Sequence, residues 1–543
     1  MRWMYGALFL SASLACADEH HDHKLSTEEF GSVHFAISCV KSAEVEFNRA
    51  VALLHSFQFE QSRSSFVEVA ERDPTCAMAQ WGIAMSHYHG LWDNGDTAAG
   101  RAALQRAEEL AGANPKTTAR ERAYINALAE IYHQDDRDLA SHARAFEQKM
   151  AELQAAYPAD SEAAIFHALT LAITAPKTDK TFANQRKCGE ILEPIFKKQP
   201  HHPGIAHYII HCYDNPVLAE QGLGAARMYA KIAPDSAHAN HMPSHLFTRV
   251  GSWDESISSN LKSAQIAAAA EASSVDGEAR DQRLHAMDYL EYAYLQSGRT
   301  QQAKAVLEQM HALPPITGQT LTGSYALAAT PARFAVELGN WTEASGLKVR
   351  EEGAPWTQAI TWTAIGVGAA RSGNLERAAQ AERTLASLRD AASKQNNPYW
   401  SNQVEVQRRE VAGWIAESGG AQTSGNSSDA IAQLRSAAEL EESMDKHPVT
   451  PGAVTPAREM LAEVLLLQNH PQDALAEYQA VLKVAPNRFN ALYGAANAAE
   501  AAGNAPAAGE YFHKLTQIAV GDERPELATA RKKITGIAQK AAL

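Results

Sequence analysis

Two pairs of histidines have a spacing that suits metal chemistry. His207 and His211 are four residues apart, and His241 and His245 repeat this spacing 34 residues later. Residues four apart share one face of an α-helix, so both members of a pair can act on the same ligand. Neutral imidazoles bind borderline divalent ions such as zinc, copper, nickel or iron. The pattern predicts a metal site built from two neighbouring helices.

The same 34-residue interval recurs along the chain and indicates internal repeats. Pro200 and Pro234 are 34 residues apart, at positions where each would end a helix. Near the C-terminus, small residues alternate with large ones as two closely packed helices require. The first copy of this pattern comprises Leu461, Ala462, Leu465, Ala474, Tyr478, Val481 and Pro486, and the second comprises Ala495, Ala496, Ala499, Ala508, Phe512 and Leu515. This period is the signature of tetratricopeptide repeats (TPRs), each a helix–turn–helix unit. We therefore predict an all-α TPR solenoid, a right-handed superhelix of roughly eleven helical pairs.

Several segments resemble a group of exported bacterial TPR proteins, and together they touch nearly the whole chain. They are Cys39 to Trp81, the motif His241-Met242-Pro243-Ser244-His245, Lys446 to Gly452, and Asn487 to Ala495. The resemblance implies the fold and export, and no established reaction comes with it. In TPR superhelices the first helix of each repeat lines the concave wall through a fixed set of positions. In this chain the residues at those positions include His207, His211, His238, His241, His245, His285, Asp214, Asp288 and Arg249.

These residues define the predicted site. The six histidines, with Asp214 and Asp288, are the expected metal ligands or their orienting partners. We expect Arg249, Arg333 and His447 to contact a ligand in the groove. Two other interpretations stay open, because groove histidines can bond a peptide directly or can pack as structural residues against nearby tyrosines.

Pro243 and four glycines bear on the local backbone. Inside a helix, Pro243 would remove a hydrogen bond and clash with the preceding turn, so the alternative is that it begins a helix. Gly251, Gly298, Gly339 and Gly373 are expected at the turns between paired helices.

The N-terminus has the features of an export signal. Residues 1–17 combine Arg2, a short apolar stretch and small residues, which predicts cleavage before Asp18. A lipid anchor at Cys16 is the alternative. Residues 18–38 begin with a histidine-rich run, Glu19 to His23, for which weak metal binding and an accidental solvated tail are the two interpretations. The remaining cysteines, Cys39, Cys76, Cys188 and Cys212, are an even number, which suits disulfides in an oxidising compartment or buried free thiols.

Composition divides the mature chain into three parts and argues against two classes of function. We divide the mature chain into a main superhelix over 39–418, a Gly/Ser/Asn-rich linker over 419–428, and terminal repeats over 429–543. The net charge of −14 and the absence of a basic stripe argue against nucleic-acid binding. No later apolar run is long enough for a transmembrane helix.

The sequence favours an exported TPR scaffold that binds a protein, a peptide or a metal-bearing ligand in a histidine-rich groove, in the periplasm or outside the cell. A metalloenzyme using a His/Asp site is the first alternative, and metal storage or transfer is the second. The chain lacks the HExxH, GxSxG and GxxxxGK[ST] motifs, so no familiar hydrolase or nucleotide enzyme is indicated and the sequence favours a non-enzyme.

Overall fold

The computed structural model describes residues 30–541 except 92–94, 135–136, 273, 275–276, 314–319, 396 and 421–426. Its regular elements are helices throughout this part of the chain. After a short 3₁₀ helix, Lys41–Ala43, come α1 Glu44–His55, α2 Phe59–Arg72, α3 Ala77–Met85, α4 Thr97–Ala113, α5 Ala119–Tyr132, α6 Leu139–Ala156, α7 Ser161–Thr174, α8 Ala183–Lys198, α9 Pro203–Tyr213, α10 Ala219–Ile232, α11 Ala237–His241, α12 Pro243–Val250 and α13 Trp253–Ala270. The remaining helices are α14 Glu278–Gln296, α15 Thr300–Ala312, α16 Leu321–Glu337, α17 Trp341–Ser345, α18 Pro355–Arg371, α19 Leu375–Lys394, α20 Pro398–Gly420, α21 Ser427–Glu442, α22 Ala457–Leu467, α23 Pro471–Val484, α24 Phe489–Ala501, α25 Ala505–Ile518 and α26 Pro525–Ala541.

Consecutive helices pack as pairs, and the first helices of successive pairs stack on one another. Examples are α14 on α16, α16 on α18, and α18 on α20. If α11 and α12 are taken as one interrupted helix, the described helices form twelve pairs followed by α26. The all-α solenoid is therefore confirmed, with one pair more than expected.

Small residues let the paired helices approach closely. A Cβ added at Gly82 would lie 2.3 Å from the ring of Phe66, and one added at Gly494 would lie 2.2 Å from the ring of Tyr478. Both glycines therefore accept an aromatic ring of the neighbouring helix where any larger residue would clash. Gly251, Gly298, Gly339 and Gly373 have φ values of 70°, 74°, 67° and 85°, as expected for turns that end a helix.

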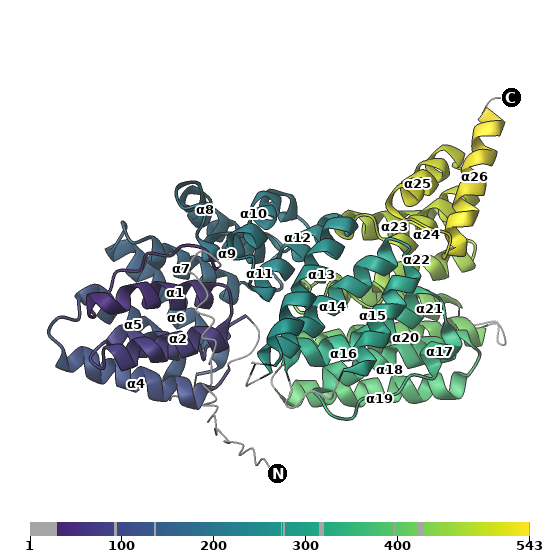
Figure 1. The fold of residues 1–543 in the computed structure, drawn as a ribbon. Helices are drawn as coiled ribbons and strands as arrows, with labels where there is room; N and C mark the ends of the chain where they lie inside the picture. Colours follow the sequence, from purple (N-terminus) through teal and green to yellow (C-terminus); the bar gives the residue numbers. More distant parts are fainter. Residues whose placement is uncertain are drawn as a thin grey trace, which may run out of the picture.

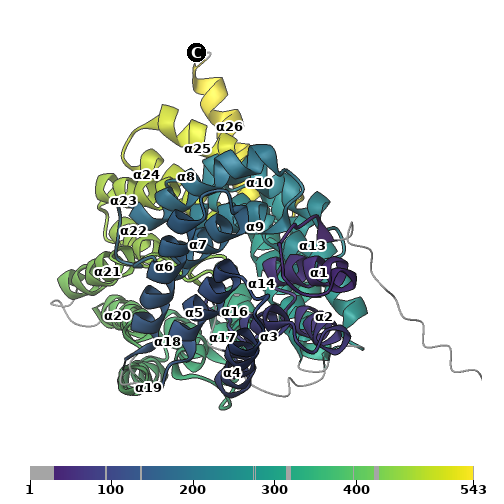
Figure 2. The ribbon, with the colours of Figure 1, turned by 90° about the vertical axis from the view of Figure 1, so that its left-hand side faces the viewer.

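Two lobes form the molecule, and α9–α12 connect them (Figure 1). The N-terminal lobe contains α1–α8, and the C-terminal lobe contains α13–α26 (Figure 1). Figure 2 shows the N-terminal lobe in front, with α25 and α26 projecting above it. The solenoid also curls onto itself, because the indole of Trp253 donates to the carbonyl of Asn487 at 3.0 Å and Val520 N donates to Ser297 O at 3.0 Å.

The four cysteines form two disulfides. Cys39 pairs with Cys76 and Cys188 pairs with Cys212, with Cα–Cα distances of 5.1 and 6.2 Å. These links settle the pairing that the sequence left open. Both lie in or next to the N-terminal lobe, where they tie neighbouring repeats together.

Three other expectations concern the ends and the linker. The signal peptide, Cys16 and the run Glu19 to His23 lie outside the described residues. Within the 18–38 segment, Phe30 and Phe35 are each 1% exposed and belong to the N-terminal core. The predicted linker, 419–428, overlaps the ends of two helices, because α20 extends to Gly420 and α21 begins at Ser427. Across the described residues, no helix is both long and apolar enough to cross a membrane.

Candidate metal centre

The structure gathers six histidines where the two lobes meet. His207 and His211 come from α9, His238 and His241 from α11, His245 from α12 and His285 from α14. His211 is partly buried and the other five are buried. The ring nitrogens form two groups of three, one of His207, His211 and His238 and one of His241, His245 and His285. Within each group the candidate ligand atoms lie within 4.8 Å of one another, so each group could hold one metal ion.

The two groups are adjacent. Ring centroids of His211 and His245 are 6.3 Å apart, and those of His238 and His241 are 6.4 Å apart. The cluster therefore has the dimensions of a site for two neighbouring ions, with three imidazoles for each.

The backbone of α11 and α12 explains part of this arrangement. Pro243 begins α12, as the alternative interpretation of the sequence had it, and α11 ends at His241. The Met242 amide still donates to His238 O at 2.9 Å, so the two short helices run on from each other. The side chains of His241 and His245 therefore still lie on the same helical face, as residues four apart do, despite the proline between them.

Three of the histidines have Nδ1 engaged by an acceptor outside the cluster. His207 Nδ1 donates to the carbonyl of His55 at 2.6 Å, and His245 Nδ1 donates to the carboxylate of Asp214 at 2.9 Å. His241 Nδ1 donates to Asn260 Oδ1 at 2.7 Å. The Asn260 amide is oriented by its own Nδ2, which donates to Ser256 O at 2.8 Å. In a neutral imidazole with a protonated Nδ1, Nε2 carries the lone pair that a metal binds.

The Nε2 atoms of these histidines point inward at other imidazoles. His241 Nε2 lies 3.0 Å from His245 Nε2, and His207 Nε2 lies 2.9 Å from His238 Nε2. A proton on His238 Nε2 would make the second contact an ordinary hydrogen bond. In the first contact both Nδ1 atoms already hold the proton, so two lone pairs face each other when both rings are neutral.

Burial keeps these imidazoles neutral. It lowers the pKa of His207 to about 3, against an opposing effect of the His55 carbonyl. Burial also lowers the pKa values of His211, His238, His241 and His285 well below their usual range, and neighbouring histidines add to the effect. For His245 burial again lowers the pKa, although the Asp214 carboxylate opposes it. Neutral imidazole is the state that coordinates a metal.

Segments distant in sequence cover the cluster on two sides. Phe57, in the α1–α2 turn, packs on His207 and His238 with centroid distances of 4.4 and 5.3 Å. Its φ of 53° is in the left-handed region, which a bulky side chain adopts only where packing holds it. On the other side Tyr289 stacks on His245 at 4.8 Å.

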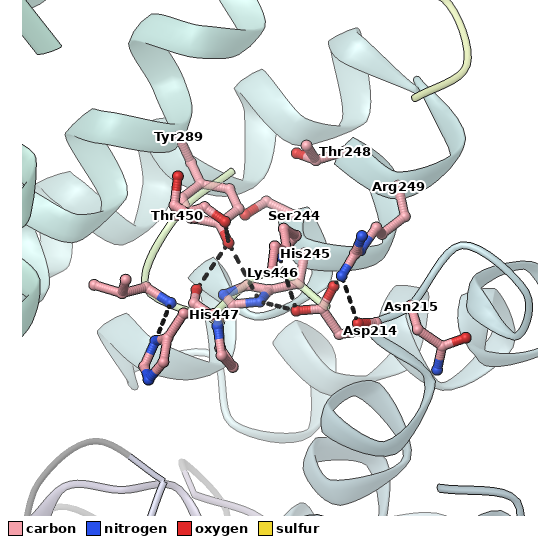
Figure 3. A network of polar contacts seen from close by, with 12 residues as sticks. Asp214, Asn215, Ser244, His245, Thr248, Arg249, Tyr289, Lys446, His447 and Thr450 are labelled. Carbon is pink, nitrogen blue, oxygen red and sulfur yellow. Dashed lines mark hydrogen bonds and ion pairs between the residues drawn. The ribbon is translucent and has the colours of Figure 1, made fainter. Parts of the chain in front are cut away.

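The second covering segment belongs to residues 445–450. Lys446 Nζ lies 3.3 Å from Asp214 Oδ2, and the Tyr289 hydroxyl is within hydrogen-bond distance of the carbonyls of Pro448 and Thr450, at 3.0 and 2.9 Å. Figure 3 shows these contacts converging on Asp214 and Tyr289. Arg249 completes the network, since its Nε donates to Asp214 Oδ1 at 2.8 Å. Asp214 therefore orients His245, while Arg249 and Lys446 balance the negative charge of the Asp214 carboxylate.

A cavity of about 330 Å³ reaches the cluster. His238, His241 and His285 form part of its wall, with Phe57 and Phe59 beside them. A small molecule in this cavity would contact three of the six imidazoles. The remaining three lie behind them.

The histidines are not the exposed groove lining that the sequence predicted. The covering segments bury them, because the superhelix curls far enough to bring Phe57 and residues 445–450 against its inner wall. The cavity is therefore the approach to the cluster that the structure shows.

Three further predicted site residues lie elsewhere. Asp288 and Arg333 form a buried ion pair at 2.6 Å, and Arg333 also pairs with Glu291 at 3.0 Å. Arg333 is 0% exposed, so it offers no contact to a ligand in a groove. His447 accepts a hydrogen bond from Val449 N at its Nδ1 and packs on Trp400, with a centroid distance of 5.4 Å, beside a different cavity. Asp214 and Arg249 do lie at the cluster.

Sequence reasoning missed several contributors. The His55 carbonyl, Asn260 and Lys446 each contact a histidine or Asp214, and Phe57 covers the cluster. Asn260 is 0% exposed, and an asparagine among the apolar positions of α13 is the one signal that a search for buried polar residues could have used.

A third group that could hold a metal ion contains a carboxylate. Glu162 bridges His55 and His202, which contact its two oxygens at 2.9 and 2.8 Å. His55 Nδ1 also lies 2.8 Å from the hydroxyl of Tyr208. Both carboxylate oxygens are thus engaged by imidazoles. The group fixes His55, whose carbonyl orients His207.

Comparison with known proteins places the repeats in a family. Residues 459–522 match the family model described as tetratricopeptide repeat. No curated protein has significant sequence similarity to the chain. Among solved structures, the human IFIT1 dimer with PPP-AAAA is 13% identical, covers 89% of this chain and 92% of its own, and has a TM-score of 0.36. The P58(IPK) TPR domain is also 13% identical, covers 73% of this chain and 99% of its own, and has a TM-score of 0.22. Both likenesses are remote, so the repeat match and the helical pairs carry the assignment as a TPR protein.

Proposed function

We propose that this TPR protein binds a pair of transition-metal ions in its six-histidine cluster. The observation that carries the proposal is the contact of 3.0 Å between His241 Nε2 and His245 Nε2. Because Asn260 and Asp214 hold the protons of these rings at Nδ1, the two lone pairs repel each other unless a cation lies beside them. Two nitrogens bound to one ion at roughly 2.0–2.1 Å in tetrahedral geometry would be about 3.3 Å apart, close to the observed distance.

The ligand set favours copper or zinc. Paired iron or manganese sites in helical proteins use bridging glutamates. Here the two groups contain imidazoles alone, and Asp214 stands behind His245 as an orienting residue. Imidazole nitrogens suit copper and zinc, and copper binds such ligands more tightly than zinc does. We therefore expect copper to bind most tightly and zinc to occupy the same site when copper is absent.

The geometry also separates metal binding from the other candidate functions. Two groups of three imidazoles hold at most two ions, so bulk storage is not supported. Direct recognition of a peptide by these histidines would require them to be accessible, whereas five of the six are buried. The TPR scaffold itself is a fold that commonly binds proteins, and such a partner would use other surfaces of the superhelix.

A catalytic role is the second candidate, and the cavity of about 330 Å³ favours it. Three imidazoles leave coordination positions of an ion open, and the cavity would bring a small molecule to them. Export stays part of the proposal, since two disulfides suit an oxidising compartment.

Elemental analysis tests the proposal. The protein is produced without a histidine tag, loaded with copper or zinc, and passed through a desalting column before the metal is quantified. We expect two ions per chain in the wild type and the loss of at least one of them in His241→Ala/His245→Ala, which removes two ligands of one group.

The matched control removes two exposed histidines. His133→Ala/His311→Ala has the same number of lost imidazoles on solvated positions, and it should retain the full metal content. Equal, substoichiometric metal in wild type and both variants would overturn the proposal. Circular dichroism of each variant distinguishes loss of ligands from loss of the fold.

A further inference from the structure

A second cavity, of about 480 Å³, is lined mainly by the C-terminal lobe, including the first helices of successive repeats, and also by residues such as Phe182, Pro216 and Arg249 from outside this lobe. Its wall includes Ile360 and Thr363 of α18, Gln407 and Glu410 of α20, and Glu441 of α21. It is separate from the metal ligands, because none of the six histidines lines it. An inference about this cavity therefore stands independently of metal binding.

Glu410 is the unusual group in this wall. It is 3% exposed, and its carboxylate has no hydrogen bond or ion pair with any described residue. Burying a carboxyl group without a partner is costly, and a buried polar group is normally bonded. Burial and the nearby Glu441 raise the pKa of Glu410 well above its usual range. The raised pKa favours the protonated, neutral form of Glu410, and a cation in the cavity would favour its ionised form.

Other polar atoms of the wall share this lack of partners. Gln407 is one helical turn before Glu410 on α20, and its buried Oε1 makes no hydrogen bond with the described residues. The indole Nε1 of Trp356 is likewise unbonded. Glu441 accepts one hydrogen bond, from Ala457 N at 3.0 Å, and keeps its other carboxylate oxygen for another donor. The cavity therefore presents three acceptor groups, of which two are carboxyls.

The cations near the cavity do not neutralise Glu410. Arg249 and Lys446 pair with Asp214, and Arg458 pairs with Glu442 and Glu477. Lys180, the remaining basic residue of the lining, is exposed on the turn before α8. Among the described residues, none of these cations forms an ion pair with Glu410.

Aromatic rings form the apolar part of the wall. Trp356 and Trp400 are stacked with centroids 5.6 Å apart and an interplanar angle of 7°, and Tyr399 packs edge-on against Trp400 at 5.0 Å. Aromatic faces attract organic cations, and they also cover a flat or aliphatic body. The combination of unpaired carboxyls and aromatic rings is that of a site for a positively charged organic group.

We propose that this cavity binds an organic cation, an amine or guanidinium carried on an apolar body, with Glu410 and Glu441 as its anionic contacts and Gln407 as a neutral acceptor. The same chemistry is offered by a free small amine and by a lysine or arginine side chain of a protein partner. The cavity volume admits either of them.

Isothermal titration calorimetry on the full chain tests this proposal with three probes of similar size. Phenethylamine is the cation, 2-phenylethanol its neutral analogue and 3-phenylpropionate its anionic analogue. We expect phenethylamine to bind at least roughly tenfold more tightly than either analogue, because a charged hydrogen bond to a buried carboxylate is worth more than a neutral one. No heat from phenethylamine up to millimolar concentration, or equal binding of all three probes, would overturn the proposal.

Glu410→Gln keeps the shape of the side chain and removes its charge. We expect it to weaken phenethylamine binding by roughly tenfold or more, while Glu439→Gln, on an exposed position of α21, leaves binding unchanged. Equal affinity in Glu410→Gln and wild type would exclude Glu410 as the anionic contact and overturn the proposal.

A terminally blocked peptide with one central arginine distinguishes the two sources of the cation. Tighter binding of this peptide than of phenethylamine would identify a protein side chain as the ligand, and the reverse order would identify a free amine. Either order supports a cation site. Competition between peptide and phenethylamine shows that both occupy the same cavity.

Discussion

The superhelix contains two regions of buried polar side chains. They differ in whether these side chains form ion pairs or contact groups of their own kind. In the C-terminal lobe, Arg333 pairs with Asp288 and Glu291, and Arg488 pairs with Glu337 and Glu459. Each of these clusters contains both signs of charge. In the histidine cluster, ring nitrogens face ring nitrogens.

The difference shows which region contains its own counter-charges. An arginine between carboxylates balances charge with groups that the chain itself supplies, so it is a structural feature. Three of the histidines have Nδ1 bonded to an acceptor outside the cluster, and two pairs of Nε2 atoms lie within 3.0 Å of each other. Under the proposed function, metal ions would supply the centre of this site, and the outer contacts would orient its ligands.

Arg488→Ala should give the largest effect, on the structural side of this comparison. Arg488 is 0% exposed and bonds Glu459 through two nitrogens at 2.7 and 2.8 Å. Removing it leaves Glu337 and Glu459 buried without their cation, which typically costs about 3–5 kcal/mol. Urea unfolding monitored by circular dichroism measures the change in free energy. A loss below about 1 kcal/mol would show that the cluster is not sealed from water.

The pH dependence of stability should have opposite signs in the two regions. Burial raises the pKa of Glu291 to about 8, so the folded state keeps a proton that the unfolded chain releases above about pH 4.3. This group therefore destabilises the fold as pH rises from 4.3 towards 8, by up to about 3 kcal/mol at pH 7. The buried histidines, with lowered pKa values, destabilise the metal-free fold as pH falls below about 6.5.

Glu291→Gln isolates the acidic contribution. Its amide cannot ionise, so the decline in stability between pH 4.5 and 7 should become shallower than in the wild type. The measurement is urea unfolding at several pH values with a chelator present. Parallel curves for wild type and variant would contradict the raised pKa.

Metal should stabilise the histidine region and leave the arginine clusters unaffected. At a free metal concentration 100 times the dissociation constant, binding adds about 2.7 kcal/mol to the stability of the fold. Thermal unfolding with and without copper or zinc should show this increase in the wild type. His241→Ala/His245→Ala should show a smaller increase, because only the group of His207, His211 and His238 remains intact. An equal increase in this variant would place the metal elsewhere.

Asp214→Asn should weaken metal binding without abolishing it. Asp214 accepts from His245 Nδ1 and contacts no inner nitrogen, and loss of such an orienting partner typically costs 10–100-fold in affinity, roughly 1.4–2.7 kcal/mol. Asp445→Asn is the matched control, because Asp445 pairs with Arg249 at 3.3 Å and, among the described residues, bonds no histidine. Competition with a chromophoric chelator gives both affinities. Equal losses would mean that Asp214 acts only through the net charge.

The repeat register predicts contacts between residues of neighbouring repeats, and it does not predict contacts between distant repeats. A 34-residue period placed His207 and His211 beside His241 and His245, and it also fixed the all-α fold and the turn glycines. These features depend on adjacent helices, whose packing is set by local sequence. The structure brings the predicted histidines together for that reason.

The covering of the cluster could not be predicted in this way. Phe57 and Lys446 lie about 150 and 200 residues from the histidines they approach, and their positions depend on the accumulated curvature of many repeats. A small change in the angle between successive pairs would move them out of reach. The burial of Asp288 against Arg333 depends on how the side chains of α14 and α16 pack together, and the 34-residue repeat spacing does not specify this packing.

The smallest effect should come from a surface pair with the same geometry as the buried one. Arg227 bonds Glu255 through two nitrogens at 2.8 and 3.3 Å, and these side chains are 53% and 39% exposed. Arg227→Ala should cost less than about 1 kcal/mol, because water solvates the remaining carboxylate and screens the lost attraction. Urea unfolding beside Arg488→Ala makes the comparison direct. If the two variants lost similar free energy, bidentate geometry rather than burial would decide the strength of these pairs, and the contrast between the arginine clusters and the histidine cluster would no longer rest on desolvation.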